Sequence, residues 1–169
     1  VGFGLLLGPD GKKLSTRKGT SGSLIDVIDE VSKHAYSQIK ERNPEVADES
    51  ARATAEQLAV AAVVWNDLRT DRKSSVKFDI ENMLNLESGT VLDVAYTYAR
   101  SRSILDKTND LSEQLDGVTP EFTEDIERQL AVSFTRFDQA IKRAAEERAP
   151  HHLVTYMQEL AKMHGKFYE

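Results

Sequence analysis

Apolar residues recur at three-to-four spacing through most of the chain, and this period limits what the chain can fold into. Nearly every candidate element in residues 23–169 carries the period, which is that of an amphipathic α-helix. The first such stretch opens with Ser23 and Asp26, a near-capping box, and ends before Pro44. A second stretch, about 48–68, is rich in alanine, which allows close packing. The pattern predicts a mostly α-helical bundle.

The first residues of the chain do not follow the helical period. Residues 2–7 form a short apolar run bounded by glycines, as a buried strand would be, and Gly8-Pro9-Asp10-Gly11 is a turn sequence. No partner strand is evident downstream, so we expect only a short β-hairpin and loop ahead of the helices. In residues 12–19 four cations stand beside two hydroxyls, which suits binding of a polyphosphate. A solvated surface or a nucleic-acid patch is the alternative.

Residues 90 to about 107 are predicted to form a helix whose two faces differ in chemistry. The apolar face holds Val91, Val94, Tyr98 and Leu105. The opposite face holds Tyr96, Arg100, Ser103 and Lys107. A tyrosine can stack on an unpaired base, an arginine can donate to a base edge or a phosphate, and a lysine attracts phosphates. An ordinary solvated face is the alternative.

Two further helices are predicted in the last third of the chain. One begins at Thr119-Pro120 or at Thr123 and runs to Ala149-Pro150, with an apolar stripe that should form the spine of the core, namely Ile126, Leu130, Phe134, Phe137, Ile141 and Ala144. The last helix starts near Pro150 and should bury Leu153, Met157 and Leu160, with Phe167 as a further candidate. His151 and His152 diverge by 100° on a helix without a carboxylate at ligand spacing, so we predict no metal site.

Charge is distributed unevenly along the chain. The formal net charge is −6, and residues 110–128 carry seven acidic residues against one arginine, so the remainder is neutral overall. That remainder can therefore offer basic patches to an RNA partner. No run approaches the roughly 18 apolar residues of a membrane helix, so no membrane span is expected. The absence of cysteine excludes disulfides and thiolate metal sites.

Several segments, in this order, resemble arginyl-tRNA synthetases, a family of class I aminoacyl-tRNA synthetases. Residues 13–17, Lys-Leu-Ser-Thr-Arg, resemble the KMSKS signature in the diverged form typical of that family, preceded by Gly-Phe-Gly-Leu and a Gly-x-Asp-Gly turn. The similarity continues through Val76-Lys77-Phe78-Asp79, Asn82-Met83-Leu84, Gly89-Thr90, residues 95–100 (Ala-Tyr-Thr-Tyr-Ala-Arg), residues 156–161 (Tyr-Met-Gln-Glu-Leu-Ala) and Phe167-Tyr168. Each segment alone is weak evidence, but their order is specific and covers essentially the whole chain.

The resemblance implies an enzyme that condenses arginine with ATP, supplied with Mg, and then charges the arginine isoacceptor of tRNA. No tightly bound cofactor is expected. In the first step negative charge builds on the departing pyrophosphate, and cations that meet this charge lower the barrier. The residues suited to this task are Lys13, Ser15, Arg17 and Lys18. The family's second signature lysine is replaced by Thr16, so either Arg17 or Lys18 reaches the phosphates or a cation elsewhere in the enzyme does so.

The resemblance also implies a domain organisation. Residues 1–22 would end the catalytic domain and carry the KMSKS-like loop, residues 23–75 would form connector helices, and residues 76–169 would form the anticodon-binding domain. In that domain the contacts to the anticodon would come from Tyr96, Arg100, Ser103 and Lys107. We interpret both ends of the chain as cuts in a longer protein, a cytoplasmic and monomeric one.

Three further expectations concern the chain by itself. The glycines around the KMSKS-like loop predict a loop that is disordered or held in an unproductive pose. The HIGH motif of class I active sites has no match, so the chain alone should not make adenylate. A free-standing RNA-binding helical module and a helical protein-interaction scaffold are the alternative functions.

Overall fold

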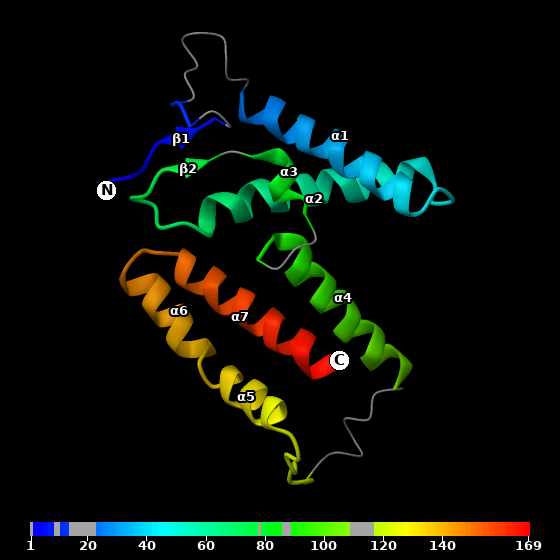
Figure 1. Ribbon diagram of the computed structural model, residues 1–169, viewed down its shortest axis with the longest axis vertical. Helices are drawn as coiled ribbons and strands as arrows, with labels where there is room; N and C mark the ends of the chain where they lie inside the picture. The colour runs from blue at the N-terminus through cyan, green and yellow to red at the C-terminus, as the bar shows by residue number, and fades with distance from the viewer. Residues whose placement is uncertain (1, 9–10, 14–22, 78, 86–88, 109–116) are drawn as a thin grey trace. The chain divides into compact units, whose positions relative to one another are not determined.

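The computed structural model describes residues 2–8, 11–13, 23–77, 79–85, 89–108 and 117–169 (Figure 1). Within these ranges the chain is mostly helical, as predicted, with one small sheet. It divides into two compact units, Val1–Leu92 and Asp93–Glu169. None of the described helices is long and apolar enough to cross a membrane.

Two long helices, α1 (Leu24–Arg42) and α2 (Asp48–Leu68), pack against each other in the first unit (Figure 1). The predicted capping box opens α1, because the Ser23 hydroxyl accepts from the Asp26 N–H and the Asp26 carboxylate accepts from the Ser23 N–H. Alanines of the stretch predicted to allow close packing lie at the helix contact and are fully or almost fully buried, namely Ala55, Ala59 and Ala62, and they meet Ala35 of α1, which is also buried. This contact forms the core of the unit.

A two-stranded parallel sheet joins the first residues to a segment 70 positions later. Strand β1 (Leu6–Leu7) pairs with β2 (Val76–Lys77), with Leu6 opposite Val76 and Leu7 opposite Lys77. Leu7 also forms an antiparallel bridge to Lys13 across the predicted turn. The expectation that no partner strand lies downstream is therefore wrong. A short helix, α3 (Ile80–Met83), follows β2, and the Asp79 side chain caps it by accepting from the Asn82 N–H.

The described residues of the second unit form the helices α4 (Val91–Lys107), whose residues from Asp93 onward belong to this unit, α5 (Asp125–Phe134), α6 (Phe137–Glu146) and α7 (His151–Tyr168) (Figure 1). Both α5 and α6 pack against α7. The single long helix predicted between about 119 and 149 is thus wrong, because the chain breaks at Thr135 and Arg136.

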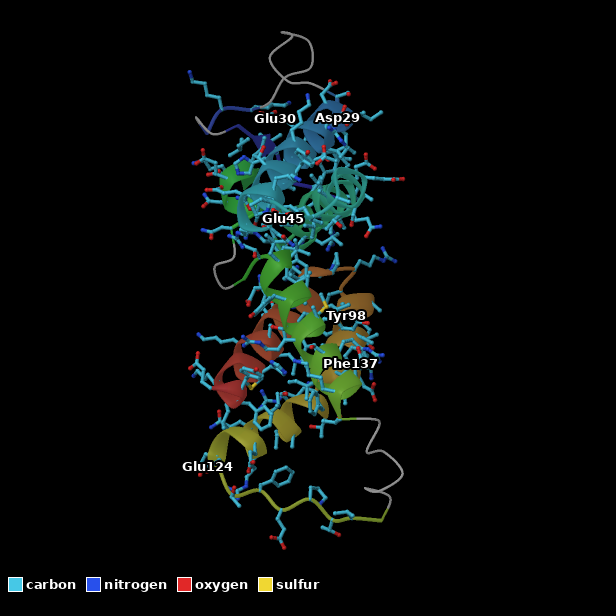
Figure 2. The ribbon with its side chains drawn as sticks, turned by 90° about the vertical axis from the view of Figure 1, so that its right-hand side faces the viewer. Asp29, Glu30, Glu45, Tyr98, Glu124 and Phe137 are labelled. Atoms are coloured by element: carbon cyan, nitrogen blue, oxygen red, sulfur yellow. The ribbon has the colours of Figure 1, made fainter. Side chains whose placement is uncertain are left out.

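Hydroxyl groups account for this break. The Ser133 hydroxyl donates to the Leu130 carbonyl at 2.6 Å and the Thr135 hydroxyl donates to the Val132 carbonyl at 2.8 Å. These bonds compete with the helical backbone pattern, and the Thr135 and Arg136 amides donate to carbonyls three residues earlier. The turn redirects the predicted apolar stripe, so that Phe134, Phe137 and Ile141 are 57%, 46% and 43% exposed (Phe137 is labelled in Figure 2).

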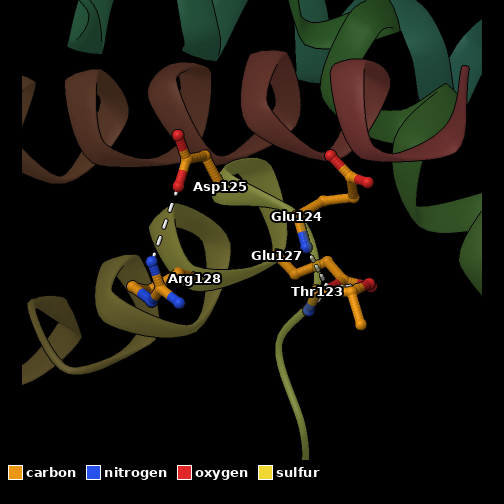
Figure 3. A network of polar contacts seen from close by, with 5 residues as sticks. All are labelled: Thr123, Glu124, Asp125, Glu127 and Arg128. Atoms are coloured by element: carbon orange, nitrogen blue, oxygen red, sulfur yellow. Dashed lines mark hydrogen bonds and ion pairs between the residues drawn. The ribbon is translucent and has the colours of Figure 1, made fainter.

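A capping box with an acidic residue at both positions starts α5. Figure 3 shows the Glu127 carboxylate beside the backbone of Glu124 and Thr123, whose N–H groups donate to it at 3.0 and 2.7 Å. Hydrogen bonds from the Glu124 N–H, and next from the Thr123 N–H, hold the pKa of Glu127 below its ordinary value of 4.5. The helix therefore begins after Glu124 and not directly after Thr119 or Thr123.

The buried face of α7 differs by one helical position from the predicted one. Val154 and Ala161 are buried, whereas Leu153, Met157 and Leu160 are only half-buried. Phe167, offered as a further buried residue, is 48% exposed. The helix itself starts at His151, directly after Pro150, as the sequence predicts.

Candidate nucleic-acid interface

The side chain of Arg100 lies between two tyrosines of the second unit. Its terminal nitrogen Nη2 donates to the Tyr96 hydroxyl at 2.7 Å, one helical turn earlier on α4. The guanidinium carbon lies 4.8 Å from the centre of the Tyr96 ring and 4.0 Å from the centre of the Tyr168 ring. Because Tyr168 is the last residue of α7, the cluster joins two helices that are remote in sequence.

The Tyr96–Arg100–Tyr168 cluster is accessible to solvent, and its contacts hold the guanidinium in one orientation. Tyr96 is 55% exposed and Tyr168 is 49% exposed, so part of each ring faces solvent. A cation over an aromatic ring is attracted to it, typically by about 0.5–1 kcal/mol at exposed sites. Of the five N–H donors of a guanidinium, one is used by Tyr96, and the others can donate to a base edge or a phosphate. The cluster thus combines stacking surfaces with a cation held in one orientation.

The four residues predicted on one face of α4 are not all brought together. Tyr96 and Arg100 are in direct contact, whereas Ser103 and Lys107 are exposed positions on later turns of α4. The opposite, apolar face of the prediction is not a buried one, since Tyr98 is 68% exposed and Leu105 is 57% exposed (Tyr98 is labelled in Figure 2).

A polar contact links α4 to α7 near this cluster. The Ser101 hydroxyl donates to the Thr97 carbonyl at 2.9 Å and lies 3.0 Å from Nε2 of His164. Because the hydroxyl has only one proton, Nε2 of His164 is assigned as the donor in this pair. This contact joins α4, which holds Arg100, to α7, which holds Tyr168.

Of the residues predicted to contact ATP, one lies in the described part of the chain. Lys13 is exposed and pairs with Leu7 at the edge of the small sheet. Ser15, Arg17 and Lys18 lie outside the described residues, as does the expected disorder of their loop.

His152 of the second unit lies beside an acidic side chain. Nε2 of His152 lies 2.7 Å from the Glu147 carboxylate, which also accepts from Arg143 at 2.9 Å. The hydrogen bond from Arg143, and next that from His152, holds the pKa of Glu147 below its ordinary range. Among the described residues, no group of three histidine or acidic side chains could hold a metal ion.

Two family models cover most of the chain. Residues 94–169 match the DALR anticodon binding domain, and residues 1–80 match the catalytic domain of class I tRNA synthetases of the (R) type. The chain therefore combines sequence of the catalytic domain of class I tRNA synthetases with a helical anticodon-binding domain.

The individual relatives that the chain matches are ligases or synthetases for arginine. The chain is 36% identical over 167 residues to an arginine–tRNA ligase of Mannheimia succiniciproducens and 35% identical over 170 residues to one of Pseudomonas fluorescens. These matches cover 99% and 100% of this chain, which spans 29% of the length of each relative. Among solved structures, the arginyl-tRNA synthetase of Thermus thermophilus matches with a TM-score of 0.78 at 28% identity, over 97% of this chain and 26% of that one. The Plasmodium falciparum arginyl-tRNA synthetase matches with a TM-score of 0.80 at 26% identity, over 99% and 28%.

The chain belongs to the arginyl-tRNA synthetase family. The order of the short motifs predicts this family, and the comparisons confirm it. The helical period does not predict the contact between Tyr168 and Arg100, because the two residues lie on different helices. A sequence signal for Tyr168 is that Phe167-Tyr168 belongs to the resemblance.

Proposed function

We propose that this chain is part of an arginine–tRNA ligase and that its main task is to bind the anticodon of arginine tRNA. The match of residues 94–169 to an anticodon binding domain supports the domain assignment. The single observation that carries the residue assignment is Arg100 held between Tyr96 and Tyr168. We retain residues 1–22 as the end of the catalytic domain, 23–75 as connector helices and 76–169 as the anticodon-binding part.

The cluster acts on unpaired bases in this proposal. The exposed parts of Tyr96 and Tyr168 stack on anticodon bases, and the remaining donors of Arg100 bind a base edge or a phosphate. Ser103 and Lys107, exposed on later turns of α4, extend the surface along the RNA backbone. Arg100 needs little reordering on binding because Tyr96 and Tyr168 already orient its guanidinium.

The enzymatic part of the proposal concerns the whole ligase, of which this chain supplies one segment. Arginine and ATP, the latter entering as its magnesium complex, would give arginyl-adenylate and pyrophosphate before transfer to tRNA. Lys13, Ser15, Arg17 and Lys18 would meet the negative charge on the departing pyrophosphate. The whole ligase would act as a monomer in the cytoplasm, and we expect no adenylate synthesis by these 169 residues alone.

A matched pair of arginine variants tests the anticodon assignment. Arg100→Ala removes the cation of the cluster, whereas Arg102→Ala removes an exposed arginine of the same helix that pairs with Asp106 at 3.0 Å. Stacking and charge at such a site contribute about 1–3 kcal/mol, so we expect Arg100→Ala to weaken tRNA binding about 5- to 150-fold. Fluorescence anisotropy with labelled arginine tRNA measures both variants.

The control decides between a local and a general effect. Arg102→Ala should bind within about twofold of the parent chain, because an exposed charge on a solvated helix contributes little. Equal losses in the two variants would point to a general basic surface and contradict the residue assignment. No binding by the parent chain would leave the scaffold function.

A further inference from the structure

Three backbone segments meet at the small sheet of the first unit. Strand pairing places two lysines on either side of one leucine. This leucine is Leu7, which is paired in parallel with Lys77 of β2 and in antiparallel fashion with Lys13. The two lysines are 64 positions apart in the sequence but are separated in space by one strand only. Strands in a sheet lie about 4.8 Å apart, so the two backbones lie roughly 10 Å apart.

Their side chains project from the same face of the sheet. Residues directly opposite each other on paired strands point to the same side, so Lys13, Leu7 and Lys77 share one face. Both lysines are exposed and Leu7 is half-buried between them. Each ammonium stands on a flexible four-carbon stem, which lets both ammoniums reach one elongated anion above Leu7.

None of the described residues neutralises either ammonium. Within the ranges that the structure describes, Lys13 and Lys77 have no ion-pair or side-chain hydrogen-bond partner. The nearest acidic residue of the same segment as Lys77 is Asp79, whose carboxylate accepts from the backbone and side chain of Asn82 at 3.3 and 2.7 Å. The charge of the pair is therefore available to a ligand.

We propose that Lys77 is a phosphate-binding residue that acts together with Lys13 on the triphosphate of ATP. This inference rests on the proposed function, in which Lys13 contacts ATP, and adds a second lysine to that contact. Thr16 stands where the signature has its second lysine, and the sequence alone leaves open which cation takes over that contact. Lys77 supplies a cation of the same type from a different segment of the chain, held beside Lys13 by strand pairing.

Titration of the 169-residue chain with inorganic tripolyphosphate tests this pairing, with the lysine side-chain Cε and Nζ signals followed by NMR. We expect the signals of Lys13 and Lys77 to shift together with one apparent Kd. Lys77→Gln should weaken the Kd about two- to fivefold, as expected for loss of one exposed charge contact, and Lys77→Arg should restore most of the affinity. Lys33→Gln, which removes an exposed lysine of α1, is the matched control and should leave the Kd unchanged.

The possible outcomes separate this inference from the proposed function. A shift of Lys13 without a shift of Lys77 would overturn the role of Lys77 and leave the ATP-contacting loop intact. If neither lysine signal shifted, the role of Lys77 and the contact of Lys13 with ATP would both be overturned. Equal shifts of Lys33 and Lys77 would also overturn the inference, because the anion would then be responding to surface charge in general. Binding of tRNA by the second unit is measured separately and is not affected by any of these results.

Discussion

The close approach of Gly4 to the backbone of Ser74 makes the Gly4→Ala substitution a sharp test of the small sheet. A Cβ atom at Gly4 would overlap the Ser74 carbonyl group, and its nearest neighbours are all backbone atoms. Backbone atoms cannot move aside as a flexible side chain would, so the added methyl group must displace the first strand segment. Gly2→Ala is the matched control, because a Cβ there meets no atom within 4 Å.

The expected cost follows from the hydrogen bonds that the displaced segment makes. These are the bonds from the Gly4 N–H to the Arg72 carbonyl at 2.6 Å, from the Val76 N–H to the Leu5 carbonyl at 2.9 Å, and from the Leu5 N–H to the Ser75 hydroxyl at 3.3 Å. At about 1 kcal/mol each, full release of the segment costs about 3 kcal/mol. This value is an upper limit, since the chain relieves the overlap by releasing the segment.

Urea unfolding followed by tryptophan fluorescence measures this cost, because the fluorescence reports on the first of the two compact units. Trp65 is the only tryptophan, is 8% exposed, and donates to the Gly89 carbonyl at 3.2 Å within the first unit. We expect Gly4→Ala to lower the free energy of unfolding by about 1–3 kcal/mol. We expect Gly2→Ala to change it by less than about 0.5 kcal/mol. Equal midpoints for Gly4→Ala and the parent chain would refute the close approach and the strand pairing that depends on it.

Three further substitutions test local features. Ser23→Ala removes the hydroxyl that caps α1 and should lower the stability of the first unit by about 1 kcal/mol in urea unfolding; an unchanged midpoint would contradict the capping box. Glu127→Gln should destabilise the second unit, measured by circular dichroism, above pH 4.5. This difference should disappear as the pH falls through the lowered pKa of Glu127, because a depressed carboxyl pKa stabilises the folded state only while the group is ionised; a pH-independent difference would contradict it. Ser101→Ala leaves His164 without its partner and should cost about 1 kcal/mol, unlike Ser103→Ala at an exposed position of the same helix.

Local sequence signals predicted the starts of α1 and α7 well. Ser23 with Asp26 before α1 and Pro150 before α7 each mark a helix start that the structure has at that place. These signals work because a cap involves residues that are close in sequence and satisfies backbone N–H groups that have no helical partner. The alanine-rich pattern of α2 was equally informative, since small residues at one face allow the contact with α1.

Features that depend on distant residues were not predictable in the same way. Strand β2 is two residues long and has its partner 70 positions earlier, so no periodicity identifies it. The helix break at Thr135 depends on where the Ser133 and Thr135 hydroxyls donate, while the apolar spacing continues across it. Of the candidate interface, the contact between Tyr96 and Arg100 follows from their i, i+4 spacing, whereas Tyr168 joins them only through the fold.

Binding of arginine tRNA before and after an anticodon swap tests whether this chain recognises the anticodon. The titration uses the parent chain, at about 50 and 200 mM salt, so that the non-specific phosphate contribution can be separated from base recognition. Our account predicts that the swapped tRNA binds at least about tenfold more weakly at both salt concentrations, a difference of about 1.4 kcal/mol. It also predicts that Arg100→Ala removes most of that difference. Equal affinity for the two tRNAs at both salt concentrations would contradict the account.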